Sequence, residues 1–276
     1  MYDLFQTVVT LSLLGGVLTA ILLCLKPITA KRLPAQWQYA VWLVALLSML
    51  LPAYKLIPIQ EANAVPPIAQ TQAAGQESPA MRRETTEAAR HETTPIQHRE
   101  VTVAPNRQMR LSNLLTYLWV SGTCLYLAVV IVSYILSLLR QRKNTVLLTD
   151  HAILDAVKRE LKITRQIVLR MSPDIQSPML VGVLFPAICL PCQEIPDENL
   201  RMVFLHELTH YKRKDLLLKW LALFVNAVHW FNPLAYLLRA NISEACEAAC
   251  DRAVTKAMSP QERKQYMATI LSLAET

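Results

Sequence analysis

Charged residues are scarce in this sequence. They make up only 18% of the 276 residues, whereas apolar residues make up 53% and are gathered into long runs. This profile indicates a membrane protein rather than a water-soluble one. The net charge of +7 does not predict a nucleic-acid surface, because Lys and Arg mostly flank the apolar runs, as at Lys26, Arg32, Arg140 and Lys143. We therefore expect no direct nucleic-acid partner.

The sequence also lacks the cysteine pattern of a secreted, disulfide-linked domain. Its six cysteines are scattered, and two lie inside apolar runs. Cys189 and Cys192 form a single C-x-x-C pair. One such pair is weak support for a redox or zinc site, so we interpret both residues as structural or incidental thiols. The cysteines are Cys24, Cys124, Cys189, Cys192, Cys246 and Cys250.

No basic segment precedes the first apolar run, from Leu4 to Leu25, so it does not resemble a cleaved signal peptide. Its length matches the ~20 residues that cross a bilayer. Similar runs extend from Trp37 to Ile57 and from Leu114 to Leu139. The sequence thus predicts two transmembrane helices within residues 1–58 and a third within 112–140.

The short loop Lys26–Gln36 is basic, and a second basic cluster follows the third run. Short basic loops stay in the cytoplasm. We therefore predict a multi-pass protein of the plasma membrane with its N-terminus outside and residues 141–276 in the cytoplasm. Residues 59–111, rich in Gln, Glu, Thr, Ala and Pro, are predicted to be a disordered external loop. A ligand-sensing role would need a hydrophobic core that this composition does not supply.

Beyond the third run, Asn144–Thr164 has a helical pattern, and short strands separated by Pro and Gly are predicted within 166–190. A small sheet there would offer an edge on which an extended substrate peptide can lie. A sheet that only packs on the next helix explains the pattern equally well.

The next segment, His206-Glu207-Leu208-Thr209-His210, is an H-E-x-x-H motif. On a helix, residues four apart share a face, so both histidines can bind one Zn²⁺ ion while Glu207 serves as general base. Asp197 is a plausible N-cap for this helix. An ordinary amphipathic helix is the alternative.

Glu247 and Asp251 are candidates for the rest of the site. They share a helical face, with Glu247 as third ligand and Asp251 orienting a ligating histidine. A solvated acidic face is the alternative. If Glu247 binds the metal, the apolar stretch Leu216–Leu238 cannot cross the membrane once, so we predict a membrane-dipping helical hairpin bent near Asn232-Pro233. His229 is expected to be a packed histidine.

Three segments together resemble the membrane-bound zinc peptidases of the beta-lactam sensor-transducer family: HELTHYKRKD from His206, HWFNP from His229, and EAACD from Glu247. The resemblance implies a mainly α integral membrane protein. Three transmembrane helices would carry a gluzincin-like zinc peptidase domain with a small β-sheet. It also implies Zn²⁺ on His206, His210 and Glu247, and cleavage of a cytosolic transcriptional repressor.

The sequence departs from that family after Asp251. Residues 252–276 are too few for a penicillin-binding domain of ~100 residues. Either the chain is a fragment, or it is a shorter relative whose signal comes from a separate sensor protein.

A rival hypothesis is a non-catalytic membrane signalling scaffold with a structural zinc site. A structural site is closed by a fourth protein ligand, typically Cys or His, whereas a catalytic site stays open. Cys246 and Cys250 are near enough in sequence to close it, although each is about a quarter turn from Glu247 around a helix.

We predict that this chain forms no covalent adduct with beta-lactams. Acylation in penicillin-recognising proteins uses a Ser with a Lys three residues later, and no Ser here has that Lys. Incubation with a fluorescent penicillin should leave the chain unlabelled on a denaturing gel. A stable fluorescent band would contradict the prediction.

Overall fold

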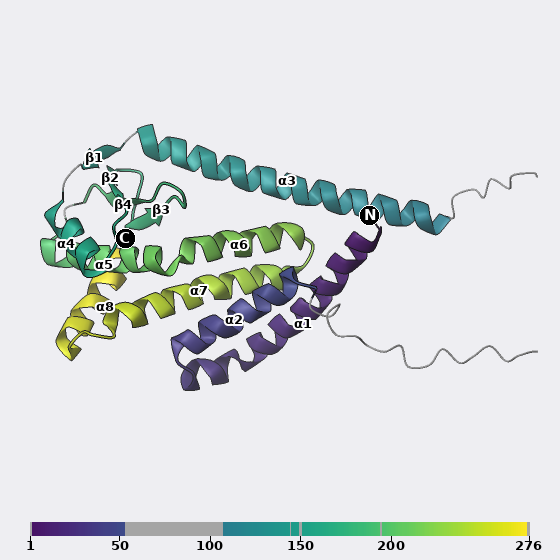
Figure 1. The fold of residues 1–276 in the computed structure, drawn as a ribbon, viewed down its shortest axis with the longest axis horizontal. Helices are drawn as coiled ribbons and strands as arrows, with labels where there is room; N and C mark the ends of the chain where they lie inside the picture. The colour runs from purple at the N-terminus through teal and green to yellow at the C-terminus, as the bar shows by residue number, and fades with distance from the viewer. Residues whose placement is uncertain (1, 53–106, 144, 149–150, 194, 275–276) are drawn as a thin grey trace, which may run out of the picture.

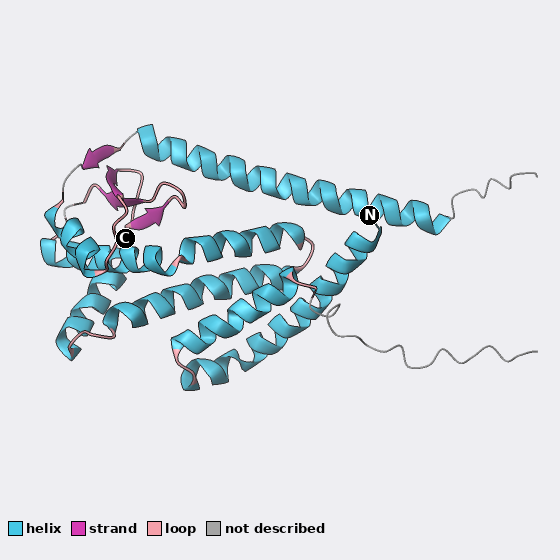
Figure 2. Cartoon of the chain, viewed as in Figure 1, coloured by secondary structure: helices cyan, strands magenta, loops and turns pink. Residues whose placement is uncertain are grey.

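The computed structural model describes residues 2–52, 107–143, 145–148, 151–193 and 195–274, which form an elongated, mainly helical molecule (Figures 1 and 2). A small sheet lies at one end and helices extend from it. The helices are α1 (Tyr2–Arg32), α2 (Ala35–Leu50), α3 (Arg107–Lys143), α4 (Ala152–Glu160), α5 (Asp197–Arg213), α6 (Asp215–Val228), α7 (Pro233–Thr255) and α8 (Pro260–Ala274). The strands are β1 (Val146–Leu148), β2 (Val168–Ser172), β3 (Met179–Val181) and β4 (Ala187–Pro191).

Two described helices are long and apolar enough to cross a membrane. Their apolar segments are Leu4–Thr29 in α1 and Leu111–Arg140 in α3. The second predicted span is not matched in the same way, because α2 has only 16 residues and ends at Leu50. Most of the predicted external loop, and the end of the second run, lie outside the described residues.

The apolar stretch after α5 folds back on itself, as predicted. Helix α6 ends at Val228, and α7 begins at Pro233, whose ring suits the first turn of a helix. Asn232 caps α7 by accepting a hydrogen bond from the Leu234 backbone N–H at 2.9 Å. The same Asn232 side chain donates to the Ser12 carbonyl at 3.0 Å, which fixes the hairpin tip against α1.

The hairpin runs beside α1 for a considerable length. At the other end of this contact, the Lys26 ammonium reaches the Glu244 carboxylate at 2.5 Å and the Asn241 side-chain oxygen at 2.8 Å. The segment of α1 between Ser12 and Lys26 is ~20 Å long at the helical rise. Helix α7, the second arm of the hairpin, therefore lies alongside a helix that is itself apolar enough to cross a membrane.

The hairpin, α1 and α2 share one hydrophobic core. Its fully buried side chains include Leu46, Met49, Leu238 and Ile242. Burial of a side chain of this size stabilises a fold by about 1.5–3 kcal/mol relative to exposure in water. In a bilayer, by contrast, the main gain comes from close packing between helices.

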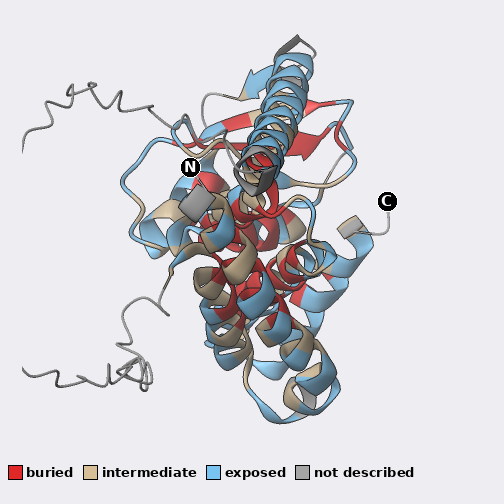
Figure 3. Cartoon of the chain, turned by 90° about the vertical axis from the view of Figure 1, so that its right-hand side faces the viewer, coloured by how far each residue is buried: buried red, intermediate tan, exposed pale blue. Residues whose placement is uncertain are grey.

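Helix α3 stands apart from this core and exposes most of its apolar surface (Figure 3). Leu125 and Val129 are 67% and 57% exposed. Its contacts are aromatic: the Tyr134 and Trp220 rings meet edge to face at 4.9 Å, and the Trp119 indole N–H donates to the Val228 carbonyl at 2.8 Å. An apolar surface of this extent needs lipid or another protein to cover it.

The sheet has the strand order β1-β2-β4-β3, with β2 and β4 parallel and the outer strands antiparallel to them. Strand β4 is buried along its whole length. Below it lies a second hydrophobic core, in which Phe204 and Leu208 of α5 pack with Leu169 and Ile188 of the sheet. Strand β3 is an edge strand beside α5.

The sequence predicted the strands of 166–190, and the structure confirms them, but two local predictions were wrong. The segment Asn144–Thr164 is not one helix, because β1 pairs with β2 before α4 begins at Ala152. Tertiary pairing there outweighs local helix preference. Asp197 is not the N-cap either: Pro196 occupies that position with extended backbone, and Asp197 begins the helix.

The hairpin predicts which positions of the chain an impermeant thiol reagent can reach from outside the cell. It returns α7 to the end of the molecule where α3 ends, so Lys143 and Lys256 should lie on one side of the membrane and position 70 on the other. Single cysteines at these positions, in a chain whose exposed Cys24, Cys124 and Cys192 are replaced by Ser, are treated with an impermeant thiol reagent on intact cells. Only position 70 should be labelled. External labelling at position 256 would contradict this arrangement.

Candidate metal centre

Helix α5 carries the H-E-x-x-H motif through the middle of the hydrophobic core beneath the sheet. Acidic Asp197 and Glu198 occupy its first turn and basic residues its last, which suits the helix dipole. All residues from Met202 to His210 are buried. The helix ends at Arg213, and the left-handed backbone of its C-cap residue Lys214 (φ 61°) turns the chain into α6.

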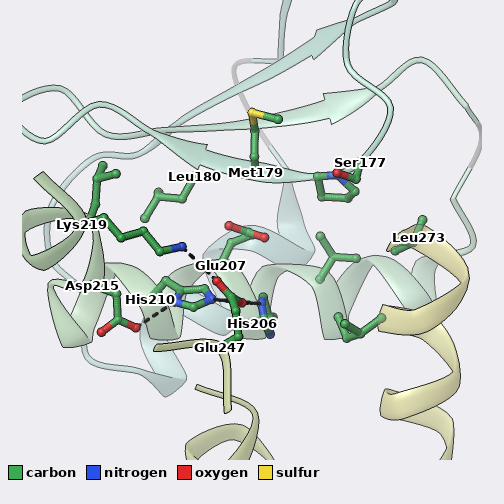
Figure 4. Close-up of a pocket in the computed structure, with 14 residues that line it drawn as sticks. Ser177, Met179, Leu180, His206, Glu207, His210, Asp215, Lys219, Glu247 and Leu273 are labelled. Carbon is green, nitrogen blue, oxygen red and sulfur yellow. Dashed lines mark hydrogen bonds and ion pairs between the residues drawn. The ribbon is translucent and has the colours of Figure 1, made fainter. Parts of the chain in front are cut away.

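The two motif histidines meet a carboxylate from α7. His206 Nε2 and His210 Nε2 are 3.0 Å apart, and Glu247 Oε2 lies 3.1 Å from His210 Nε2 and 3.5 Å from His206 Nε2 (Figure 4). Ligand atoms held tetrahedrally by bonds of about 2.0–2.2 Å lie roughly 3.3–3.6 Å apart. The spacing of these three atoms therefore fits one zinc ion to within a few tenths of an ångström.

Each histidine is also held from its other ring nitrogen. His210 Nδ1 lies 2.8 Å from Asp215 Oδ2, and His206 Nδ1 lies 2.7 Å from the Tyr266 hydroxyl. Tyr266 in turn donates to Asp251 Oδ1 at 2.7 Å, and that oxygen is 3.3 Å from His206 Nδ1. Carboxylate contacts of this kind fix the ring orientation of metal-binding histidines.

Sequence reasoning placed Asp251 beside a histidine but missed Asp215 and Tyr266. Asp215 follows His210 by five residues, just past the helix end, where helical spacing gives no guide. Tyr266 is 60 residues from His206 and reaches it only because α8 packs on α5. No sequence pattern marks such a tertiary contact.

Lys219 separates the roles of the two oxygens of Glu247. Its ammonium donates to Glu247 Oε1 at 2.9 Å, which leaves Oε2 toward the histidines. Glu244, three residues before Glu247 in α7, instead pairs with Lys26. Burial alone would raise the pKa of Glu247, but hydrogen bonds from His206 and His210 lower it below its usual range.

Cys250, one of the two cysteines that the sequence offered as a possible closing ligand, is a further neighbour. Its thiol lies 3.9 Å from His206 Nδ1, and His206, His210 and Cys250 form a fully buried group with metal-binding atoms within 4.8 Å of one another. The thiol sits on the Nδ1 side of His206, whereas Glu247 meets Nε2. Two alternative donor sets therefore share the histidine pair.

Glu207 lies beside the histidines under strand β3, at the bottom of a groove of about 300 Å³ (Figure 4). It is only 9% exposed. Burial raises the pKa of its carboxyl, although positive charge on His206 and His210 opposes the shift. The groove is walled by Ser177–Leu180 on one side and by Ile270 and Leu273 of α8 on the other.

The other candidates lie away from this groove. His229 is buried at the hairpin tip, where its Nε2 is 3.1 Å from the Met49 carbonyl oxygen, as expected for a packed histidine. Cys189 is buried in β4 and Cys192 is exposed after it, and both are free thiols. Neither cysteine lines the groove.

Comparison with known proteins assigns the chain to a family. Residues 6–276 match the family described as BlaR1 peptidase M56. The regulatory protein BlaR1 of Bacillus licheniformis is 31% identical over 158 residues, which are 55% of this chain and 26% of that protein. The methicillin resistance mecR1 protein of Staphylococcus aureus (strain Mu50 / ATCC 700699) is 32% identical over 110 residues, 39% of this chain and 19% of that protein.

The chain thus spans about a quarter or less of the length of these relatives. The family match, however, covers nearly every residue and includes the buried histidine pair. This chain belongs to the BlaR1 peptidase M56 family of membrane metallopeptidases.

Proposed function

We propose that this chain is a membrane-embedded zinc metalloendopeptidase that cleaves a cytosolic protein, a transcriptional repressor, in signal transduction. The convergence of His206 Nε2, His210 Nε2 and Glu247 Oε2 beside the buried Glu207 carries this proposal. The names of the relatives, a regulatory protein and a resistance protein, support a role in signalling. The peptidase family supports proteolysis as the reaction.

The metal is Zn²⁺, held by His206, His210 and Glu247. Imidazole and carboxylate ligands in this number are typical of catalytic zinc sites, which keep a fourth position for water or substrate. When bound, zinc lowers the pKa of a water molecule and polarises the scissile carbonyl. Asp215, Tyr266 and Asp251 keep the imidazole rings aimed at the ion.

Glu207 moves the proton in this reaction. Glu207 lines the groove beside the histidine pair, whereas it is Glu247 that approaches the Nε2 atoms. The raised pKa of Glu207 suits a group that accepts a proton from the attacking water and returns it to the leaving amine. Such positioned acid–base groups accelerate reactions by roughly 10²–10⁴-fold.

The edge of β3 binds the substrate chain. Only one side of this strand is paired within the sheet, and Ser177–Leu180 form the wall of the groove above Glu207. An extended peptide added to this edge would gain backbone hydrogen bonds and lie across the metal. The groove's apolar side chains, Met179, Ile270 and Leu273, would contact its side chains.

The site lies next to the bilayer on the cytoplasmic side. Helices α1 and α3 cross the membrane with the N-terminus outside, and the apolar run that begins in α2 forms the third span. The α6–α7 hairpin dips into the bilayer beside α1, to which it is joined at Ser12 and Lys26. The signal reaches the site from a separate sensor protein or through these helices.

The alternative function is a signalling scaffold with a structural metal. The buried group of His206, His210 and Cys250 favours it, because a thiolate ligand could close the site to substrate. The metal-binding variants below separate the two donor sets.

Replacement of Glu207 by Gln should abolish cleavage and leave zinc bound, because a base is lost and no ligand is. We expect a rate at least ~10²-fold lower. Cleavage of candidate cytosolic repressors is followed by mass spectrometry, and zinc by elemental analysis of the purified chain. The control is Glu198→Gln, in the first turn of the same helix and outside the groove. Wild-type cleavage by the Glu207 variant would make the base assignment wrong.

Zinc content tests the third ligand. Glu247→Gln should weaken zinc binding by at least the ~10–100-fold that changes to groups around a ligand cost. Glu244→Gln, three residues away and paired with Lys26, should retain zinc, as should Cys250→Ala. Zinc loss from the Cys250 variant with retention by the Glu247 variant would support the scaffold instead.

A further inference from the structure

A second pocket, of about 410 Å³, lies beside the metal groove and shares Leu180, His210 and Leu216 with it. Its rim is basic. No acidic residue occurs among its described lining residues, whereas four basic ones do: Lys162, Arg165, Lys212 and Lys214. We call it the basic pocket.

The side chains of these four cations are not neutralised by ion pairs within the described residues. In the described part of the chain, none of them takes part in a salt bridge, and the adjacent Asp215 is engaged by His210 and Arg213. Among the described residues, Arg165 is the only one of the four whose side chain makes a hydrogen bond, from its guanidinium to the Leu184 carbonyl. Four like charges around one cavity repel one another unless an anion lies among them.

The loop that Arg165 contacts carries two exposed apolar side chains. Leu184 is 71% exposed and Phe185 84% exposed, the latter the highest value among the large apolar residues described. The loop turns sharply at Gly182, which has φ +81° and where a Cβ would lie 2.3 Å from the Phe185 carbonyl oxygen. The tip of this loop is therefore a tight turn that requires glycine, and it presents two apolar side chains next to the basic pocket.

The position of this tip points to the bilayer. In Figure 1, β3 runs in the same direction as α6, so the β3–β4 turn lies on the side of the sheet toward the long apolar helices. The pocket's other wall is the start of α6, at Leu216 and Leu217, where the hairpin begins. A group of basic residues next to exposed apolar side chains is typical of a protein surface that contacts a membrane, with the cations at the headgroups and the apolar side chains in the bilayer.

We propose that the basic pocket binds the anionic headgroup of a membrane phospholipid while Leu184 and Phe185 insert among the adjoining lipids. The proposal rests on the membrane location of α3 and α6 and not on the peptidase reaction. An acidic protein segment would satisfy the cations but leave the two apolar side chains in water. A bound lipid would also contact Leu180 and Val183 and so hold the β3 strand in place beside the metal groove.

Insertion of the tip is tested with an environment-sensitive fluorophore on Phe185→Cys, in the full chain with Cys24, Cys124 and Cys192 replaced by Ser. The control is Gln176→Cys, exposed just before the other end of β3. In vesicles of phosphatidylcholine and phosphatidylglycerol, the probe at 185 should shift to shorter wavelength and be quenched by brominated acyl chains. The probe at 176 should do neither. Equal emission from both sites would contradict insertion.

Headgroup binding is tested by native mass spectrometry of the detergent-purified chain after delipidation and addition of single lipids. The wild type should retain phosphatidylglycerol and not phosphatidylcholine. The double variant Lys162→Gln, Lys212→Gln should bind phosphatidylglycerol roughly tenfold or more weakly, because each basic group near an anionic surface contributes several-fold. Inorganic phosphate added instead of lipid should not be retained.

The matched control removes two exposed lysines outside the pocket, Lys256→Gln and Lys264→Gln, and should bind lipid as the wild type does. Far-ultraviolet circular dichroism and size-exclusion chromatography show that each variant is folded. Equal lipid retention by both double variants would overturn the proposal. So would selective retention by the wild type of an acidic peptide in place of lipid, which would assign the pocket to a protein partner.

Discussion

The structure depends on one geometric constraint: α7 must return Glu247 to the histidines of α5. A straight apolar helix after α5 would carry this carboxylate ~30 Å away across a bilayer. The chain instead turns at Asn232-Pro233, where the Asn side chain caps α7 and anchors the tip to Ser12. Glu247 therefore meets the histidines only because the hairpin closes, and the hairpin is held by the helices beside it.

Helix α7 joins the two hydrophobic cores. Leu238 and Ile242 belong to the core shared with α1 and α2, while Cys250 and Val254 belong to the core beneath the sheet. Glu247 lies between these two groups on the same helix. Because a packed helix moves as a rigid element, a displacement of the hairpin relative to the sheet would change the distance from Glu247 to the histidines. Helices α1 and α2 thus share a hydrophobic core with the helix that carries Glu247.

Local sequence rules recovered the parts of this arrangement that depend on short spacing. Helical periodicity placed His206 beside His210, and the proline at 233 marked the bend correctly. Contacts between distant elements were beyond such rules, so Tyr266 was missed although it touches His206. The strand β1 was missed because three residues acquire their extended form only by pairing with β2. Residue types predicted the chemistry, but packing determined which partners surround it.

The two glutamates of the site show how packing assigns different roles to the same side chain. Burial acts to raise the pKa of both carboxyls. At Glu247, hydrogen bonds from both histidines and from Lys219 reverse this effect and keep the carboxylate ionised, as the proposed role of metal ligand requires. At Glu207, burial outweighs the positive charge of the histidines and the backbone hydrogen bond from Leu180, so its pKa stays raised. Environments that push two pKa values apart are what distinguish a proton-transfer group from a charged ligand, and here Lys219 and the aim of the imidazoles create that difference.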